Sequence, residues 1–169
     1  LGDGRGFLLA QFLDQNNILW DLSTKGSGQT KYSRGGDGRL TLKGAVRELL
    51  ATEFLTSLGV PTSQTFSIIE TGEKLQRNDE PSPTRSAVLV RRSNSHIRIG
   101  TFQRLKYYNE YDNIALLLNH LSENYFTNIK SKKSIETLAE NIFLESVKRI
   151  AESIGRIVIA GFVHGVLNT

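Results

Sequence analysis

A lysine and two carboxylates are the first residues in this sequence whose types and order suggest chemistry. Lys25 follows the apolar run at 18–22, and a segment with helical periodicity at 42–58 carries Glu48 and Glu53. A strand lysine that pairs with a glutamate on the next helix can hold the phosphates of a bound nucleotide. Helical spacing alone does not choose between the two carboxylates, and surface ion pairs would explain both equally well.

The stretch that contains this lysine is rich in glycine and in positive charge. Residues 21–39 read DLSTKGSGQTKYSRGGDGR, in which five of nineteen residues are Gly and four are Lys or Arg. Glycine-rich turns expose backbone N–H groups to phosphate. The order does not match a P-loop, because the Lys precedes the glycines. The opening LGDGRG leads into a strand-like run, so it resembles a dinucleotide fingerprint only loosely. Plain turn geometry remains the simpler explanation of the glycines.

A second basic cluster follows a later apolar run. Arg91, Arg92 and Arg98 lie in RRSNSHIRIG, and an arginine can bind two phosphate oxygens at once. His96 lies between them, but no second His or carboxylate stands nearby at ligand spacing. We therefore expect His96 to pack or to donate and accept hydrogen bonds rather than to bind a metal.

The elements that would position these residues fall into two groups. Short apolar runs and turns come first, and long amphipathic helices follow, which predicts an α+β fold with a sheet-rich part joined to a helical part near 103–110. No internal repeat is visible. The sheet-rich part is expected to contain a hairpin at 7–14 and 18–22 with a turn at Asn16 and Asn17, a helix at 42–58 capped by Gly59, and strands at 60–70 and 86–92 around an exposed loop at 71–85. The helical part is expected to contain helices at 111–126 and 134–161. The apolar stripe of the second of these helices consists of Ile135, Leu138, Ile142, Ala151, Ile154 and Val158.

Composition excludes several classes of protein. The 169 residues contain no Cys, so the segment has neither disulfides nor thiolate metal sites, which fits a reducing compartment. No apolar run is long enough to span a bilayer. The net charge of +4 suits an anionic ligand as well as ordinary solubility. The one dense basic run, KSKK at 130–133, lies between the two expected helices, and no aromatic platform for nucleic acid accompanies it.

Several longer motifs, taken together, resemble the selenoprotein O family of kinase-like proteins, which transfer AMP from ATP to protein hydroxyls. LGDGR, KGSGQTKYSRGGDGR, VRELLATEFLTSLGVPTSQTFSI, SHIRIGTF and GFVHGVLNT occur in the family's order and cover nearly the whole chain. The resemblance implies a protein-kinase-like fold, with a nucleotide-binding N-lobe at 1–105 and the start of a helical C-lobe at 106–169. It also implies ATP and Mg²⁺ or Mn²⁺ as cofactors and proteins with Ser, Thr or Tyr hydroxyls as substrates, with no nucleic acid or membrane partner.

The resemblance also assigns roles to individual residues. It matches Glu48, rather than Glu53, to the helix glutamate that pairs with the phosphate-contacting lysine. The family's ATP lies inverted relative to that of kinases, so that its α-phosphate is exposed. The implied nucleotide contacts are Gly2, Gly4, Arg5, Lys25, Asp37, Gly38, Arg91 and Arg98.

The sequence departs from the family pattern in places. Arg92, Ser93 and Asn94 stand where the family more often has an apolar-Ala-Pro run, and the family's catalytic Asp and its metal ligands would follow Thr169. Because the chain starts with Leu, contains no Met and ends directly after an apolar segment, we expect a fragment that has no transfer activity alone. The location expected is the cytoplasm for a bacterial source and the mitochondrion for a eukaryotic one. Alternatives are a nucleotide-binding pseudokinase-like module and a protein kinase that transfers the γ-phosphoryl group.

Overall fold

The computed structural model describes residues 5–129 and 134–165. Contacts divide the chain into two compact units between His96 and Ile97, and each unit is described by itself. The family resemblance implies a lobe boundary at 105/106, which stays a prediction. Ile97 and Phe102, which precede that boundary, pack with the apolar cluster of the helical unit.

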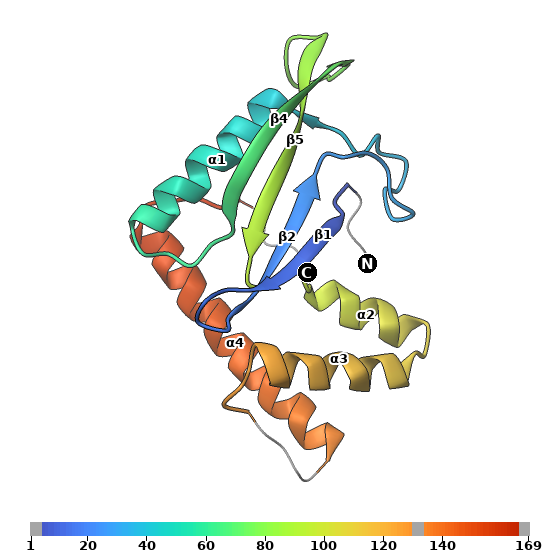
Figure 1. Cartoon of the computed structure of the whole chain (residues 1–169), viewed down its shortest axis with the longest axis vertical. Helices are drawn as coiled ribbons and strands as arrows, with labels where there is room; N and C mark the ends of the chain where they lie inside the picture. The colour runs from blue at the N-terminus through green and yellow to red at the C-terminus, as the bar shows by residue number, and fades with distance from the viewer. Residues whose placement is uncertain (1–4, 130–133, 166–169) are drawn as a thin grey trace. The chain divides into compact units, whose positions relative to one another are not determined.

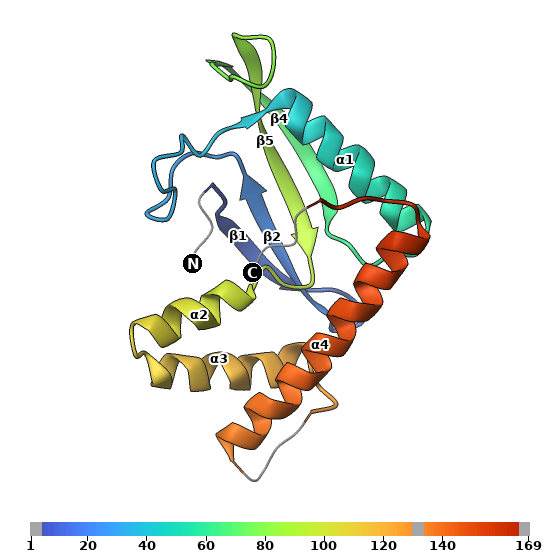
Figure 2. The same ribbon diagram turned by 180° about the vertical axis from the view of Figure 1, so that it is seen from behind.

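The first unit is a five-stranded antiparallel sheet with one helix across it. Strand β5 lies at its centre, since β2, β3 and β4 all pair with it, and β1 pairs with β2. Helix α1 crosses one face of β4 and β5 in both views of the ribbon (Figures 1 and 2). The elements are β1 (Leu8–Leu13), β2 (Leu19–Lys25), β3 (Leu40–Thr41), α1 (Leu42–Ser57), β4 (Gln64–Leu75) and β5 (Thr84–Ser93).

The β1–β2 hairpin confirms the predicted pairing of the first two apolar runs. Its turn places Asn17 at a φ of 58°, and the Asp14 carboxylate accepts hydrogen bonds from the backbone N–H groups of Asn16 and Ile18. Asx-type bonds of this kind stabilise turns that a plain apolar sequence would not form. The turn therefore fixes the register in which Leu19–Lys25 enters the sheet.

Helix α1 begins and ends close to the predicted limits. Thr41 caps it, because its hydroxyl accepts a hydrogen bond from the Gly44 N–H at 3.0 Å. Leu58 is the C-cap and Gly59, at a φ of 71°, is the left-handed residue that follows it. The helix packs on the sheet through a small buried cluster of Leu40, Ala45, Ala87 and Leu89, with Leu42 and Ile68 against it.

The predicted exposed loop at 71–85 is wrong at both ends. Strand β4 continues to Leu75, and β5 begins at Thr84. Lys74 pairs with Arg85 across the hairpin, and the Leu75 side chain is buried. Pairing with a neighbouring strand here overrides a polar local sequence, which is the usual limit of strand prediction from composition.

In the residues that the structure describes, the second unit has three helices, α2 (Ile99–Tyr107), α3 (Tyr111–Asn124) and α4 (Ile135–Ile159). The sequence predicted α3 and α4 but treated most of α2 as a connection. The unit's core is Leu118 and Leu121 of α3 against Leu138 and Ile142 of α4. The predicted apolar stripe of α4 is buried only in the first half, since Val158 is 67% exposed.

Candidate functional site

The candidate site is built on one face of the sheet, where β2 and β5 lie side by side. Lys25 pairs with Leu89, and Ser23 pairs with Arg91, so Lys25 and Arg91 project from the same face. Helix α1 covers this face and brings Glu48 to both cations. The helix is held against the sheet by the buried cluster in which Ala45 of α1 packs with Leu40 of β3 and with Ala87 and Leu89 of β5.

Glu48 bridges the two basic side chains. Lys25 Nζ donates to Glu48 Oε2, and Arg91 Nη1 donates to Glu48 Oε1 at 3.3 Å. The three side chains are each only about one-fifth exposed, at 20%, 21% and 19% for Lys25, Glu48 and Arg91. The structure thus pairs Lys25 with Glu48, the carboxylate that the family resemblance had selected. Glu53 is exposed, and no ion pair involving it is found among the described residues.

The cluster carries more positive than negative charge. Burial lowers the pKa of Lys25, Glu48 opposes that shift, and the neighbouring positive charges of Arg91 and Arg5 lower it further. Arg5 lies close by because its backbone carbonyl accepts the Gly26 N–H at 2.8 Å. Glu48 thus pairs with two cations, and the charge of a third, Arg5, acts on Lys25, so the cluster has an excess of positive charge that attracts an anion.

A buried donor of Arg91 supports the same conclusion. Its Nε–H is buried and has no hydrogen-bond partner in the part of the chain that the structure describes. Such donors are uncommon in folded proteins and call for a ligand or water. The Ser27 hydroxyl, in the glycine-rich stretch, is also buried and has no hydrogen-bond partner among the described residues. Sequence reasoning did not single out Ser27, because one serine among many carries no signal.

The glycine-rich segment forms an irregular loop at 26–39 between β2 and β3. Its two ends meet: Ser27 and Arg39 form an isolated antiparallel bridge, and the Gly28 N–H donates to Gly38 O at 3.2 Å. Gly38 has a φ of 68°, and a Cβ there would lie 2.0 Å from Gly28 O. The close approach of two backbone segments therefore explains this glycine without a ligand.

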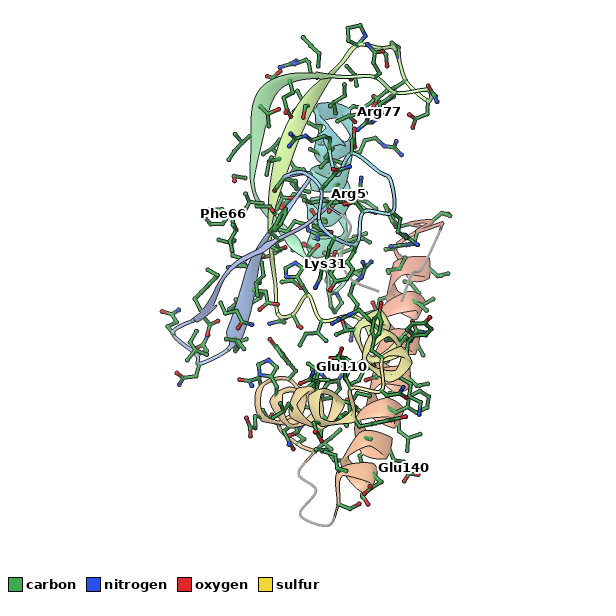
Figure 3. The ribbon with its side chains drawn as sticks, turned by 90° about the vertical axis from the view of Figure 1, so that its right-hand side faces the viewer. Arg5, Lys31, Phe66, Arg77, Glu110 and Glu140 are labelled. Carbon is green, nitrogen blue, oxygen red and sulfur yellow. The ribbon has the colours of Figure 1, made fainter. Side chains whose placement is uncertain are left out.

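Asp37 lies at the exit of this loop and is ionised at neutral pH. Burial works against ionisation, but the Arg39 backbone N–H and the Arg77 guanidinium lower the Asp37 pKa below its usual value. Arg77 Nη2 pairs with the carboxylate at 2.8 Å. In Figure 3, Arg77 lies between the tip of the β4–β5 hairpin and the 26–39 loop.

His96 makes hydrogen bonds to β2, as the sequence predicted. Its Nε2 lies 2.9 Å from Ser23 Oγ, and its backbone N–H donates to the Asp21 carboxylate at 2.8 Å. Asp21 is buried and also accepts a bond from Gln11 Nε2 at 2.7 Å. This buried polar cluster anchors the chain beyond β5 to the neighbouring strand.

The remaining predicted residues belong to the second unit, have other partners or fall outside the described residues. Arg98 is an exposed residue of the second unit, where it occupies the N-cap position of α2. Arg92 donates to Gln64 and stacks on Trp20 at 4.5 Å from the ring centroid, so it has structural partners of its own. Gly2 and Gly4, the KSKK run and Thr169 lie outside the described residues.

Two classes of feature are not found within the described residues. No group of three or more His, Asp or Glu side chains is arranged to hold a metal ion in 5–129 and 134–165. Over the same ranges, none of the helices combines the length and the apolar character needed to cross a membrane.

Comparisons with known proteins match the whole chain. The family model described as protein adenylyltransferase SelO covers residues 1–169. Curated relatives named protein nucleotidyltransferase YdiU are 53% identical over 169 residues in Synechocystis sp., 54% over 174 residues in Trichodesmium erythraeum and 38% over 170 residues in Rhodopseudomonas palustris. Each alignment covers 100% of this chain but only 35%, 37% and 33% of the relative, so the chain spans about a third of their length. The chain belongs to the protein adenylyltransferase SelO family.

Proposed function

We propose that this chain supplies the nucleotide-binding part of an enzyme that transfers AMP from ATP to hydroxyl groups of proteins. The observation that carries the proposal is the Glu48 bridge between Lys25 and Arg91. A carboxylate that orients two partly buried cations, with a third cation close to Lys25, suits the binding of a triphosphate.

In the proposed reaction, a Ser, Thr or Tyr hydroxyl oxygen forms a bond to the α-phosphorus of ATP. The bond between that phosphorus and the oxygen bridging to the β-phosphorus breaks, pyrophosphate leaves with the electron pair, and a base accepts the hydroxyl proton. Lys25, Arg91 and, by family resemblance, Arg5 and Arg98 bind and neutralise the phosphates. Positioning and charge neutralisation are the main contributions that a protein makes to such transfers.

The divalent metal ion of the proposal supplies further neutralisation of the phosphates when it is bound. The described residues offer no ligand set for it, and the resemblance assigns both the ligands and the base to residues beyond Thr169. The residues of this chain bind and orient the nucleotide.

The position of the label on ATP tests the proposal. The full-length protein in which this sequence occurs is incubated with a protein substrate and ATP labelled at either the α- or the γ-phosphate. We expect label from the α-phosphate alone to be transferred, and Arg91→Gln to reduce transfer by about 10- to 100-fold, as the loss of one charge-assisted contact implies. Transfer of the γ-label would instead support a protein kinase. ATP binding without transfer of either label would support a pseudokinase-like module.

A further inference from the structure

The tip of the β4–β5 hairpin is joined to the exit of the glycine loop by several charges. We call residues 73–80 the hairpin tip and residues 37–43 the loop exit. Both segments carry acidic and basic residues, and three charged residues of each segment pair with an opposite charge on the other. The three ion pairs are Glu73–Arg39 at 2.8 Å, Arg77–Asp37 at 2.8 Å and Glu80–Lys43 at 3.9 Å.

Arg39 is the junction of this network. Besides Glu73, its guanidinium donates to Ser27 O at 3.2 Å, on the opposite end of the 26–39 loop. Its backbone N–H donates to the Asp37 carboxylate at 2.9 Å. Arg39 therefore joins the hairpin tip, the loop entrance and the loop exit. A network of this kind is more effective than isolated surface ion pairs, which contribute little.

Arg77 neutralises the charge of Asp37 at the loop exit. The family resemblance implies that Asp37 is itself a nucleotide contact, and its ionised carboxylate, left unpaired, would repel the phosphates of that nucleotide. The Arg77 side chain is 24% exposed and that of Asp37 is 48% exposed, so the arginine is the better shielded partner of the pair.

We infer that the hairpin tip is a brace for the nucleotide loop, and that Arg77 and Glu73 are positioning residues that hold the loop exit in its binding geometry. This inference rests on the proposed function. A glycine-rich loop loses conformational entropy when it closes on a ligand, and a loop that is already held loses less. Removing the brace should therefore weaken nucleotide binding while leaving the transfer step itself largely unaffected.

The hairpin offers a matched control. Arg85 also lies on it and forms a two-bond ion pair with Glu70, at 2.6 and 2.5 Å, and within the described residues neither side chain bonds to the 26–39 loop. Arg85→Gln removes an arginine–carboxylate pair of the same kind from the same hairpin. Any effect that is specific to the brace must be present in Arg77→Gln and Glu73→Gln and absent from Arg85→Gln.

The experiment measures the Kd for α,β-methylene ATP by calorimetry, together with KM for ATP and kcat, in the full-length protein in which this sequence occurs. We expect Arg77→Gln and Glu73→Gln to raise Kd and KM by about threefold to tenfold, the range of a networked ion pair, with kcat changed by less than about twofold. Arg77→Lys should recover part of the affinity because it keeps the charge. Thermal unfolding of each variant establishes that all are folded at the assay temperature.

The other possible results either contradict the brace or show that the brace and the proposed function fail independently. Unchanged Kd values in both brace variants, with or without a loss of thermal stability, overturn the inference. So does an equal loss of affinity in Arg85→Gln, because the hairpin as a whole would then matter rather than these pairs. If the wild-type protein binds the analogue but transfers no AMP, the proposed function fails, and the Kd values still decide on the brace. No binding by the wild type overturns both.

Discussion

Replacing Glu48 by Gln tests the centre of the site most directly. The variant keeps the size of the side chain but removes the only carboxylate that bridges Lys25 and Arg91. Two partly buried cations then face each other without compensation. We expect a loss of both stability and nucleotide binding, because the same contact orders the helix against the sheet and orients the lysine.

The magnitude follows from the geometry. At 3.3 Å, and with an effective dielectric constant of about 20, the Arg91–Glu48 attraction is about 5 kcal/mol before desolvation is counted. Desolvation of partly buried charges offsets much of this attraction, whereas removal of one partner of a fully buried pair costs about 3–5 kcal/mol. Since the three side chains retain about one-fifth exposure, we expect the free energy of unfolding to fall by about 2–3 kcal/mol.

The assay compares Glu48→Gln with Glu53→Gln by urea unfolding and by transfer of the α-phosphate label. Glu53 lies on the same helix but is exposed, so its variant should change the free energy of unfolding by no more than about 0.5 kcal/mol. Glu48→Gln should also slow transfer by about 10- to 100-fold through misplacement of Lys25. Equal losses in the two variants, or a larger loss in Glu53→Gln, would refute the assignment.

Three further outcomes are expected from the same structure. In urea unfolding, Gly38→Ala should lower the free energy of unfolding by more than Gly72→Ala does. Both residues have a positive φ, but only a Cβ added at Gly38 would meet backbone atoms, at 2.0 Å. Equal losses of stability in the two variants would contradict this. Leu89→Ala should lower the free energy of unfolding by about 2–5 kcal/mol, since Leu89 is fully buried beneath α1; a loss below about 1 kcal/mol would argue against this core. The Asp37–Arg77 pair should stabilise the protein above the unfolded pKa of the carboxylate, about 3.9, and this stabilisation should be lost as the pH falls through the lowered pKa of the folded state. The thermal midpoints of wild type and Arg77→Gln should therefore differ at neutral pH and become equal in acid. A difference that persists in acid would exclude Asp37 as its source.

Local patterns in the sequence predicted those elements whose signals lie within a few residues. The hairpin turn at Asn17 and the glycine after the end of α1 both depend on residues close by in the sequence. The pairing of Lys25 with Glu48 was different, because helical periodicity left Glu53 equally possible. The resemblance to a known family selected Glu48, and the structure places its carboxylate on Lys25.

The features that the sequence did not predict depend on partners far along the chain. Strand β4 extends to Leu75 because β5 lies opposite, although the residues around it are polar. Helix α2 spans 9 residues, which is too short for a clear periodic pattern, and its Phe102 packs against the apolar cluster of α3 and α4. Two ion pairs of the hairpin tip join residues that are far apart in the sequence, by 34 positions for Arg39–Glu73 and by 40 for Asp37–Arg77. Composition at either end gives no indication of such a pairing.

The glycines that first drew attention to the nucleotide loop are weaker evidence for phosphate binding than the charges beside it. A Cβ at Gly26 would lie 2.5 Å from Leu40 Cβ, and one at Gly38 would meet Gly28 O, so the crossing of the loop ends requires both residues to be glycine whether or not a ligand binds. No comparable packing reason exists for pairing both Lys25 and Arg91 with one carboxylate, because partly buried cations raise the electrostatic energy of the folded protein. Residues that a fold tolerates at a cost are better indicators of a binding site than residues that it requires. The case for a nucleotide site in this chain therefore rests on Lys25, Glu48 and Arg91, and variants of these three residues decide it.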